Sequence, residues 1–360
     1  MRVTLEDVCE KGASNLKQSD VVSMTGEYPI YGAAGYLGNV DFYHQEKPYV
    51  AIVKDGAGIG RTTLHPAKSS VIGTMQYLLP KDNVLPEYLY YVVRHMHLEK
   101  YFTGATIPHI YFRDYKNEKF NLDSLDKQAE IVEILGKAEL VILKRRQQLA
   151  ELDNLIKARF VEMFGGIHDS KMYPYKLVND LTDVISGGTP SRDVNEYWEG
   201  GTIPWVKTTE LQNNYVTEVE EYITEEGLNN SSAKIVPAGT VLIAMYGQGK
   251  TRGMTAYLGI EACTNQACAC ILPSDKINQT FLWQFFVLSY DNLRNRAKGG
   301  NQPNLNGNII KNYPVLYPPI ELQEQFAAFV KQTDKSKVVV QKALDKAQTL
   351  FDSLMQKYFG

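Results

Sequence analysis

Glycine, lysine and threonine follow one another in residues 247–251, in the order GQGKT. The end of a phosphate-binding loop has this order, because glycine lets the backbone approach a phosphate and lysine neutralises its charge. The complete loop would need a glycine at position 244, where this chain has Ala244. The matching segment of the first half, residues 56–61 (GAGIGR), has no lysine. The pattern therefore favours a glycine-rich loop that exposes basic side chains, with a nucleotide site as the alternative.

Other patterns that support catalysis or metal binding are incomplete. Residues 317–320 (YPPI) resemble the catalytic tetrapeptide of adenine methyltransferases, but that motif begins with Asn or Asp, and here the prolines fit the start of a helix. The sequence has no nucleophile elbow, no His-Glu-x-x-His and no histidine near a candidate nucleophile. Cys9, Cys263, Cys268 and Cys270 have no histidine at ligand spacing, which favours reduced, packed thiols. We therefore predict no catalytic residue and no metal site.

Composition indicates a globular protein. The chain has 360 residues and a formal net charge of −3, and 44% of its residues are hydrophobic. No apolar run approaches the roughly 20 residues that span a bilayer, and residues 1–7 lack a signal-peptide core, so we expect a cytoplasmic protein. The net charge is mildly unfavourable for nucleic-acid binding. However, basic residues are concentrated in glycine- and asparagine-rich segments, which leaves a basic face possible.

The chain repeats one pattern at a spacing of 195 residues. This spacing relates Phe164-Gly165 to Phe359-Gly360, and further upstream it drifts by only a few residues. Matched residues include Gly104 and Gly299, Pro108 and Pro303, Gln128 and Gln323, and the Gly-x-Gly-x-x-Arg patterns that end at Arg61 and Arg252. So few gaps over so long a stretch indicate a duplicated unit.

The elements divide into four parts. Residues 1–122 and 166–318 are predicted to form two similar heads of mixed α and β structure. Strands are expected at residues 49–53, 75–79, 239–245 and 267–272, and short helices at 86–101 and 279–290. Residues 123–165 and 319–360 are predicted to form two long helices. The fold class is therefore α+β.

The two long helices carry matching heptad seams. Residues 126–163 contain no proline and a single glycine, and the second helix is expected to begin at Ile320. The predicted helix-pairing residues are Leu135, Ile142, Leu149, Leu152, Ile156, Val340, Leu344, Phe351 and Leu354. Arg145, Arg159, Thr333 and Lys337 interrupt the seams, and such residues weaken a coiled coil but can fix its register. We expect an antiparallel coiled coil; the alternative is a helix that lies on its own head.

Several segments together resemble the specificity (S) subunits of type I restriction-modification enzymes. They are residues 186–191 (SGGTPS), 203–206 (IPWV), 301–306 (NQPNLN) and 318–325 (PPIELQEQ). The order head, helix, head, helix is also the organisation of that family. The resemblance implies that each head is a target recognition domain reading one half of a bipartite DNA site, and that the paired helices set the unread spacer. It also implies that two modification subunits dock around the helices and that restriction subunits join them. Those modification subunits would bind S-adenosylmethionine and methylate adenine, and this chain would hold no cofactor.

Candidate contacts to double-stranded DNA lie in the polar loops. Amide and guanidinium groups suit base edges, and lysine suits phosphates. The candidates are Lys54, Arg61, Thr106, His109 and Arg113 in the first head, and Lys207, Thr208, Gln248, Lys250, Arg252, Gln302 and Asn304 in the second. Arg61 and Arg252 are the best supported, because they follow both glycine loops at matching places. Solvated turns would have the same composition.

The first head departs from the family pattern. It has residues 11–14 (KGAS) in place of the Gly-Gly-Thr-Pro stretch, and residues 104–110 (GATIPHI) replace the glycine-asparagine-proline loop. Different loops on similar heads predict an asymmetric target. Two other classes stay open: a two-headed scaffold that binds proteins rather than DNA, and an enzyme that uses residues 247–251.

Overall fold

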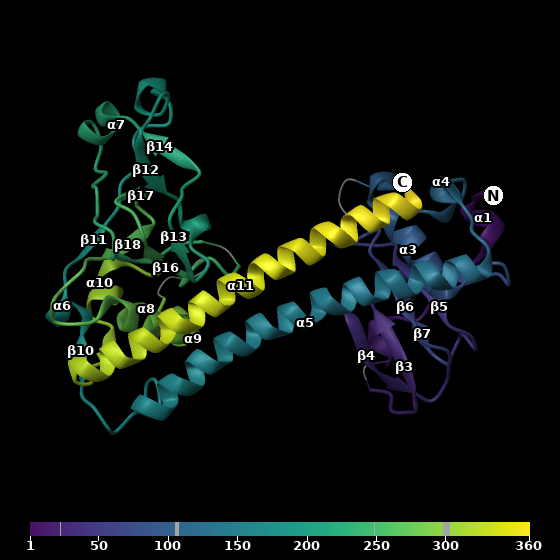
Figure 1. Ribbon diagram of the computed structural model, residues 1–360, viewed down its shortest axis with the longest axis horizontal. Coiled ribbons are helices and arrows are strands. Elements are labelled where there is room, and N and C mark those ends of the chain that lie inside the picture. The colour runs from purple at the N-terminus through teal and green to yellow at the C-terminus, as the bar shows by residue number, and fades with distance from the viewer. Residues whose placement is uncertain (22, 105–107, 248, 298–302) are drawn as a thin grey trace. The chain divides into compact units, whose positions relative to one another are not determined.

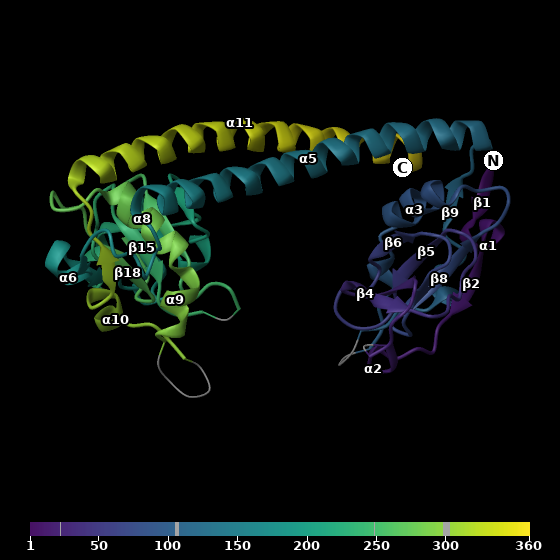
Figure 2. The same ribbon diagram turned by 90° about the horizontal axis from the view of Figure 1, so that it is seen from below.

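Helices α5 (Leu125–Phe164) and α11 (Ile320–Phe359) are each one uninterrupted run of 40 residues. The computed structural model describes residues 1–21, 23–104, 108–247, 249–297 and 303–360 (Figures 1 and 2). The chain forms two structural units. Unit 1 comprises Met1–Gln147 and Val340–Gly360, and unit 2 comprises Gln148–Val339. Each unit therefore contains one head and part of both long helices.

Unit 1 is built from three small sheets and short helices. Its main sheet has the order β2-β8-β5-β6, and a second sheet has the order β4-β3-β7. The strands are β1 (Arg2–Thr4), β2 (Cys9–Ala13), β3 (Tyr28–Gly32), β4 (Gly35–Val40), β5 (Tyr49–Val53), β6 (Thr62–His65), β7 (Ser70–Val71), β8 (Met75–Pro80) and β9 (Lys119–Asn121). The shorter helices are α1 (Leu5–Val8), α2 (Gln18–Val21), α3 (Pro86–His95), η1 (Leu98–Tyr101) and α4 (Phe112–Tyr115).

Unit 2 repeats this arrangement. Its main sheet has the order β11-β18-β15-β16-β13, and a second sheet has the order β14-β12-β17. The strands are β10 (Tyr175–Leu177), β11 (Val184–Ser186), β12 (Ile203–Val206), β13 (Asn214–Val216), β14 (Glu221–Ile223), β15 (Val241–Ala244), β16 (Thr255–Leu258), β17 (Cys263–Thr264), β18 (Cys268–Ile271) and β19 (Pro314–Leu316). The shorter helices are α6 (Val178–Leu181), η2 (Asn195–Tyr197), η3 (Thr208–Glu210), α7 (Glu225–Asn229), α8 (Gln279–Leu288), α9 (Tyr290–Asn295) and α10 (Gly307–Lys311).

Strand pairing shows that the two heads share a core topology, to which unit 2 adds strand β13, parallel to β16 at the edge of its main sheet. The sheet β2-β8-β5-β6 corresponds to β11-β18-β15-β16, with antiparallel neighbours in both. In the second sheets, β3 and β12 each have one antiparallel and one parallel neighbour. A third pair, β1 with β9, corresponds to β10 with β19. The predicted α+β fold with two similar heads is therefore confirmed.

The long helices pack against each other within each unit. In unit 1, Ile131, Leu135 and Ile142 of α5 share a core with Phe351 and Met355 of α11. In unit 2, the other end of α5 contributes to a core that also contains the first turns of α11 and helix α8, which lies against the sheet (Figure 2). Since the beginning of each helix meets the end of the other, the pair is antiparallel.

Most of the predicted seam lies at these interfaces. Leu135, Ile142, Ile156, Val340 and Phe351 are buried, and Leu149, Leu152, Leu344 and Leu354 are half-buried. The interruption at Lys337 has a partner on the opposite helix: its Nζ lies 2.6 Å from Asp153 Oδ1. The heptad pattern does not predict the burial of Phe160 and Phe164, which are fully buried because the core of the head extends onto α5.

A buried glutamine ties each long helix to its own head at its first turns. The Gln128 amide oxygen accepts a hydrogen bond from the Leu85 backbone N–H at 2.8 Å, and its amide nitrogen donates to the Asn83 and Asp123 carbonyls. Gln323 accepts from the Asn278 N–H at 2.9 Å and donates to the Pro318 carbonyl at 2.8 Å. Because both glutamines join the start of a short helix to the start of a long one, the duplication extends to single hydrogen bonds.

Candidate nucleic-acid interface

In the first head, Lys54 and His109 are brought together after strand β5. The Ile110 N–H donates to the Lys54 carbonyl at 3.0 Å, and the Gly56 N–H donates to the Pro108 carbonyl at 3.0 Å. His109 Nδ1 lies 2.7 Å from Asp55 Oδ1, and Lys54 Nζ lies 3.8 Å from Asp55 Oδ2. Asp55 therefore orients the imidazole of His109 and offsets part of the positive charge of Lys54.

Exposed aromatic and basic side chains continue this surface. The Tyr111 ring stacks on His109 with centroids 6.3 Å apart, and the Arg113 guanidinium lies 4.8 Å from the Tyr111 ring centroid. The Arg113 side chain is 77% exposed. Arg61 is also exposed, immediately before strand β6. Exposed planar rings and guanidinium groups can stack on bases or reach phosphates.

In the second head, Arg252 and Asn304 lie in two loops that are tied together. The Leu305 N–H donates to the Met245 carbonyl at 3.0 Å, and Arg252 donates from Nη1 to the Pro303 carbonyl. The Arg252 guanidinium is thus part of a contact between loops. Lys250 is exposed, and in the described residues no ion pair involves it.

The expected equivalence of Arg61 and Arg252 is wrong. The Val53 N–H, at the end of β5, closes the first loop on the Arg61 carbonyl at 2.9 Å. The corresponding Ala244 N–H, at the end of β15, closes the second loop on the Met254 carbonyl at 2.9 Å. The second loop is longer, so the structural counterpart of Arg61 is Met254.

Lys207 is held by carboxylates in the second head. Its Nζ lies 2.7 Å from Glu220 Oε2 and 2.9 Å from Glu221 Oε1. The hydrogen bonds to Glu220 and Glu221 raise the pKa of Lys207. Burial would raise the pKa of Glu221, but hydrogen bonds from Lys207 and Arg192 lower it. A phosphate would have to displace these acids, which disfavours Lys207 as a DNA contact; Thr208 begins η3 beside it and is half-buried.

The Gly-Gly-Thr-Pro segment is anchored by two tryptophans. Trp205 Nε1 donates to the Gly188 carbonyl and Trp198 Nε1 to the Ser191 carbonyl, each at 2.9 Å. The Arg192 guanidinium lies 3.6 Å from the Trp198 ring centroid. This motif therefore has a structural role in the head. The candidates Thr106, Gln248 and Gln302 lie outside the described residues.

Sequence reasoning did not select Asp55 or Tyr111. Two signals were available: Asp55 is an acid directly after Lys54, and Tyr111 is an aromatic residue between His109 and Arg113. It also did not select Tyr290 and Arg294, which donate hydrogen bonds to backbone carbonyls of residues 249–252. The contacts of Arg294 join residues far apart in the sequence, so pattern alone does not reveal them.

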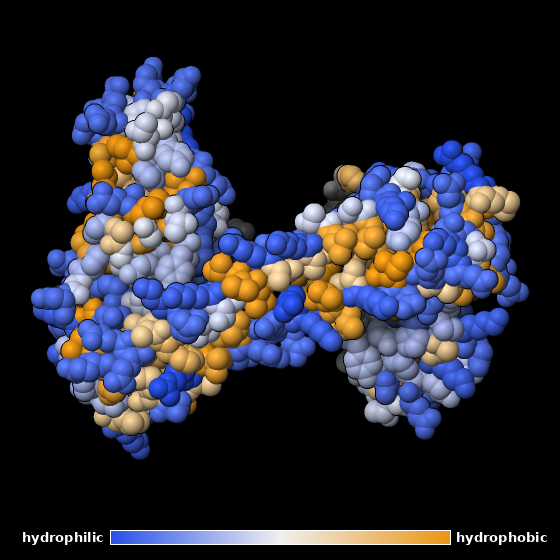
Figure 3. Space-filling view, viewed as in Figure 1, coloured by the Kyte–Doolittle hydropathy of each residue, from blue (hydrophilic) through white to orange (hydrophobic). Residues whose placement is uncertain are grey.

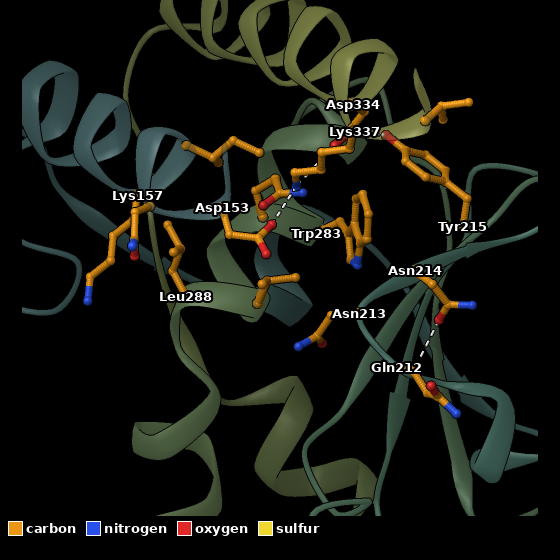
Figure 4. A pocket seen from close by; sticks show the side chains of 15 residues that line it. Asp153, Lys157, Gln212, Asn213, Asn214, Tyr215, Trp283, Leu288, Asp334 and Lys337 are labelled. Carbon is orange, nitrogen blue, oxygen red and sulfur yellow. Dashed lines mark hydrogen bonds and ion pairs between the residues drawn. The ribbon is translucent and has the colours of Figure 1, made fainter. Parts of the chain in front are cut away.

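A groove of about 600 Å³ lies beside the long helices in unit 2 (Figure 4). Asp153 and Ile156 of α5 line it with Asp334, Lys337 and Val338 of α11. The head contributes Trp283 and Tyr215, whose hydroxyl donates to Asp334 Oδ2 at 3.1 Å.

Unit 1 has a groove of about 440 Å³ at the equivalent place. Its lining residues Gln348, Phe351, Glu139, Ile142 and Leu143 are the repeat counterparts of Asp153, Ile156, Asp334, Lys337 and Val338. Glu139 accepts a hydrogen bond from the Tyr91 hydroxyl at 2.8 Å, as Asp334 does from Tyr215. The duplicated fold therefore carries a duplicated groove.

The described residues contain no group of three or more His, Cys, Asp or Glu side chains that could hold a metal ion. All four cysteines are buried and free. Burial raises the pKa of Cys9 to about 12 and that of Cys263 to about 11. Among the same residues, no helix is both long and apolar enough to cross a membrane.

Two proteins of similar sequence are specificity subunits of type I restriction enzymes. The specificity subunit of the type I restriction enzyme MjaIX from Methanocaldococcus jannaschii is 30% identical over 172 residues, which are 46% of this chain and 38% of that protein. The specificity subunit of EcoR124I/EcoR124II from Escherichia coli is 25% identical over 222 residues, 59% of this chain and 52% of that protein. The chain thus matches less than two thirds of the length of either relative.

Solved structures and a family model agree with this description. The S subunit of a type I restriction-modification system from M. genitalium has a TM-score of 0.60 at 16% identity, and the match covers 100% of this chain and 96% of that one. At that identity the likeness shows the fold. The model of the type I restriction modification DNA specificity domain matches residues 1–154 and 173–347. With one matched segment on each copy of the repeat, the chain belongs to the family of type I restriction modification DNA specificity domains.

Proposed function

We propose that this chain is the sequence-reading subunit of a type I restriction-modification complex, in which each head reads one half of an asymmetric, bipartite DNA site. One observation carries the proposal: the heads share a core strand order, but the basic groups of the first loop are not repeated at equivalent places in the second. Lys54 corresponds to the buried Met245, the exposed Arg61 to the half-buried Met254, and His109 to Asn304. Two copies of one scaffold with different contact groups suit two different half-sites, and the long helices would set the spacer between them.

The chain itself is proposed to be non-catalytic. Adenine methylation requires the base to leave the duplex, so one subunit can hold the flanking bases while another performs the reaction. We propose that two modification subunits supply S-adenosylmethionine and the methyltransferase site, that restriction subunits join them, and that the complex acts in the cytoplasm.

Mapping adenine methylation in host DNA with and without the chain tests this function. Deletion is expected to abolish methylation at one motif, which should consist of two different half-sites separated by a fixed number of unread base pairs. Re-expression of the chain should restore that motif. Retention of every methylated motif after deletion, or loss of an undivided one, would contradict the proposal.

The equivalent grooves support the binding of two copies of one partner. Both lie beside exposed apolar side chains: Leu143 is 62% exposed and Val338 is 53% exposed. Figure 3, seen in the same view as Figure 1, shows hydrophobic residues at the surface where the long helices run. A solved structure with a TM-score of 0.54 and 15% identity is described under the structural basis of complex assembly and conformational transition of the type I restriction-modification system. We propose that each groove receives the same segment of one modification subunit.

Charge placed in one groove should therefore remove one partner copy. Leu143→Asp and Val338→Asp are each expected to reduce a complex with two modification subunits to one with a single subunit, since an aspartate loses most of its hydration in an apolar contact. The double variant should bind none. Leu350→Asp is the control, because Leu350 is 57% exposed on α11 and lines neither groove. Native mass spectrometry of the co-expressed complex measures the stoichiometry, and two copies retained in both single variants would exclude the grooves as docking sites.

A further inference from the structure

We propose that residues 249–252 of the second head form a preformed phosphate-binding turn, and that Arg294 and Tyr290 of helix α9 are positioning residues that hold it. The inference rests on the proposed function, which it deepens by locating one contact to the DNA backbone. It assigns to Arg294 a role in shaping the loop, whereas Lys250 would contact the phosphate.

The brace gathers the carbonyl groups of the turn on one side. Arg294 donates from Nη2 to the Gly249 carbonyl at 2.9 Å and from Nη1 to the Arg252 carbonyl at 2.5 Å. The Lys250 carbonyl accepts from the Tyr290 hydroxyl at 2.7 Å. Three carbonyls in four residues therefore face α9, and hydrogen bonds from a charged donor are stronger than neutral ones.

The opposite side of the turn is left for an anion. Among the described residues, no acceptor takes the backbone N–H groups of Gly249, Lys250 or Thr251. Lys250 and Gly249 are exposed, and within the same residues no carboxylate pairs with Lys250, Arg252 or Arg294. Successive free amides beside a lysine form a concave site that attracts phosphate oxygens.

Close packing holds the turn against the brace. Gly253 has a φ of +87°, and a Cβ at that position would lie 3.0 Å from Arg294 Cγ. A larger residue would therefore be strained by its backbone and would push the turn from α9. Arg252 fixes the other flank through its hydrogen bond to the Pro303 carbonyl.

In the described part of the first head, no cation takes the place of Arg294. Gly60 corresponds to Gly253, because the two glycines donate to the equivalent Val53 and Ala244 carbonyls. A Cβ at Gly60 would lie 2.6 Å from the Glu99 backbone nitrogen, whereas a Cβ at Gly253 would meet Arg294. Glu99 is an acid whose carboxylate lies 3.2 Å from His97 Nδ1, and a carboxylate cannot donate to carbonyls. The turn is thus a property of one head, and disruption of the brace should weaken contacts at one half-site.

A double-mutant cycle on the full chain in complex with its modification subunit tests the inference. The probes are a duplex that carries the mapped methylation site and a scrambled duplex, and affinity is measured across a KCl series. Lys250→Ala should weaken binding about tenfold and reduce the salt slope by about one. Arg294→Met should cause a similar loss, and the double variant should lose little more than either single one, because both changes disable the same contact.

Further variants separate positioning from general destabilisation. Arg294→Lys should recover part of the affinity. Tyr290→Phe removes only a hydroxyl and should weaken binding about threefold without unfolding the head. Arg296→Met is the matched control, because the Arg296 guanidinium lies over Tyr313, 4.5 Å from the ring centroid, and makes no contact with the turn. Its effect should add to that of Lys250→Ala.

Two results would overturn the inference: additive losses for Arg294→Met and Lys250→Ala, or wild-type affinity and salt slope in both Arg294→Met and Tyr290→Phe. Equal binding of the mapped and scrambled duplexes by the wild-type complex would instead contradict the proposed function. In that case the double-mutant cycle would still measure the contribution of the turn to DNA affinity, because contacts to the DNA backbone persist in non-specific binding.

Discussion

Phe160→Ala is expected to destabilise unit 2 by about 4 kcal/mol. Phe160 is fully buried, and its ring centroid lies 5.0 Å from that of Phe164, 5.4 Å from that of Phe326 and 5.8 Å from that of Phe281. These rings come from both long helices and from α8. Truncation would leave a cavity that three separate elements would have to move to fill, so the loss should lie within the range of about 3 to 5 kcal/mol that is typical of a buried aromatic residue.

Tryptophan fluorescence during urea unfolding measures this effect selectively. The three tryptophans, Trp198, Trp205 and Trp283, all lie in unit 2. Val161→Ala, at the adjacent and 45% exposed position, is the control and should change stability by no more than about 0.5 kcal/mol. Equal midpoints for Phe160→Ala and the control would show that the aromatic cluster is not the core of unit 2.

Gln128→Leu and Gln323→Leu are expected to cost about 3 and about 2 kcal/mol, each in a different unit. Leucine fills similar space, so the loss arises from backbone groups left without partners. Gln128 satisfies the Leu85 N–H and two carbonyls, whereas Gln323 satisfies the Asn278 N–H and one carbonyl. The larger set of orphaned groups gives the larger loss.

Hydrogen exchange monitored by mass spectrometry can assign each loss to its unit. Gln128→Leu should speed exchange in residues 86–95, and Gln323→Leu should speed exchange in residues 279–288. Gln332→Leu is the control, because Gln332 is exposed on α11. If either core variant exchanges like the control, the buried amide does not hold its short helix.

The long helices could be predicted from sequence because their signals are local. A run without proline and with apolar residues at heptad spacing is sufficient, and the ends of α5 lie within two residues of the expected bounds, 123–165. The similarity of the two heads could also be predicted, because the two halves of one sequence can be compared directly. What the pattern missed on α5 was Phe160 and Phe164, where the partner is the head rather than the other helix.

The candidate site was less predictable, because its geometry is set by hydrogen bonds between distant segments. The sequence pattern paired Arg61 with Arg252 because both are arginines. The backbone hydrogen bonds that close the two loops instead make Arg61 equivalent to Met254. Lys207 similarly gains its acidic partners because β12 pairs with β14, and nothing in the residues around Lys207 predicts that register. His109 meets Asp55 for the same reason.

Because each long helix is divided between the units, the second unit can complete its fold before the first. Residues 1–147 of unit 1 share a core with Phe351 and Met355, so that core stays open while unit 2 is translated. Domains usually fold as they leave the ribosome, the first one first. Here unit 2 is one continuous segment, Gln148–Val339, and can complete its fold first. The first head meanwhile carries an uncovered apolar stripe on α5 until residues 340–360 are synthesised.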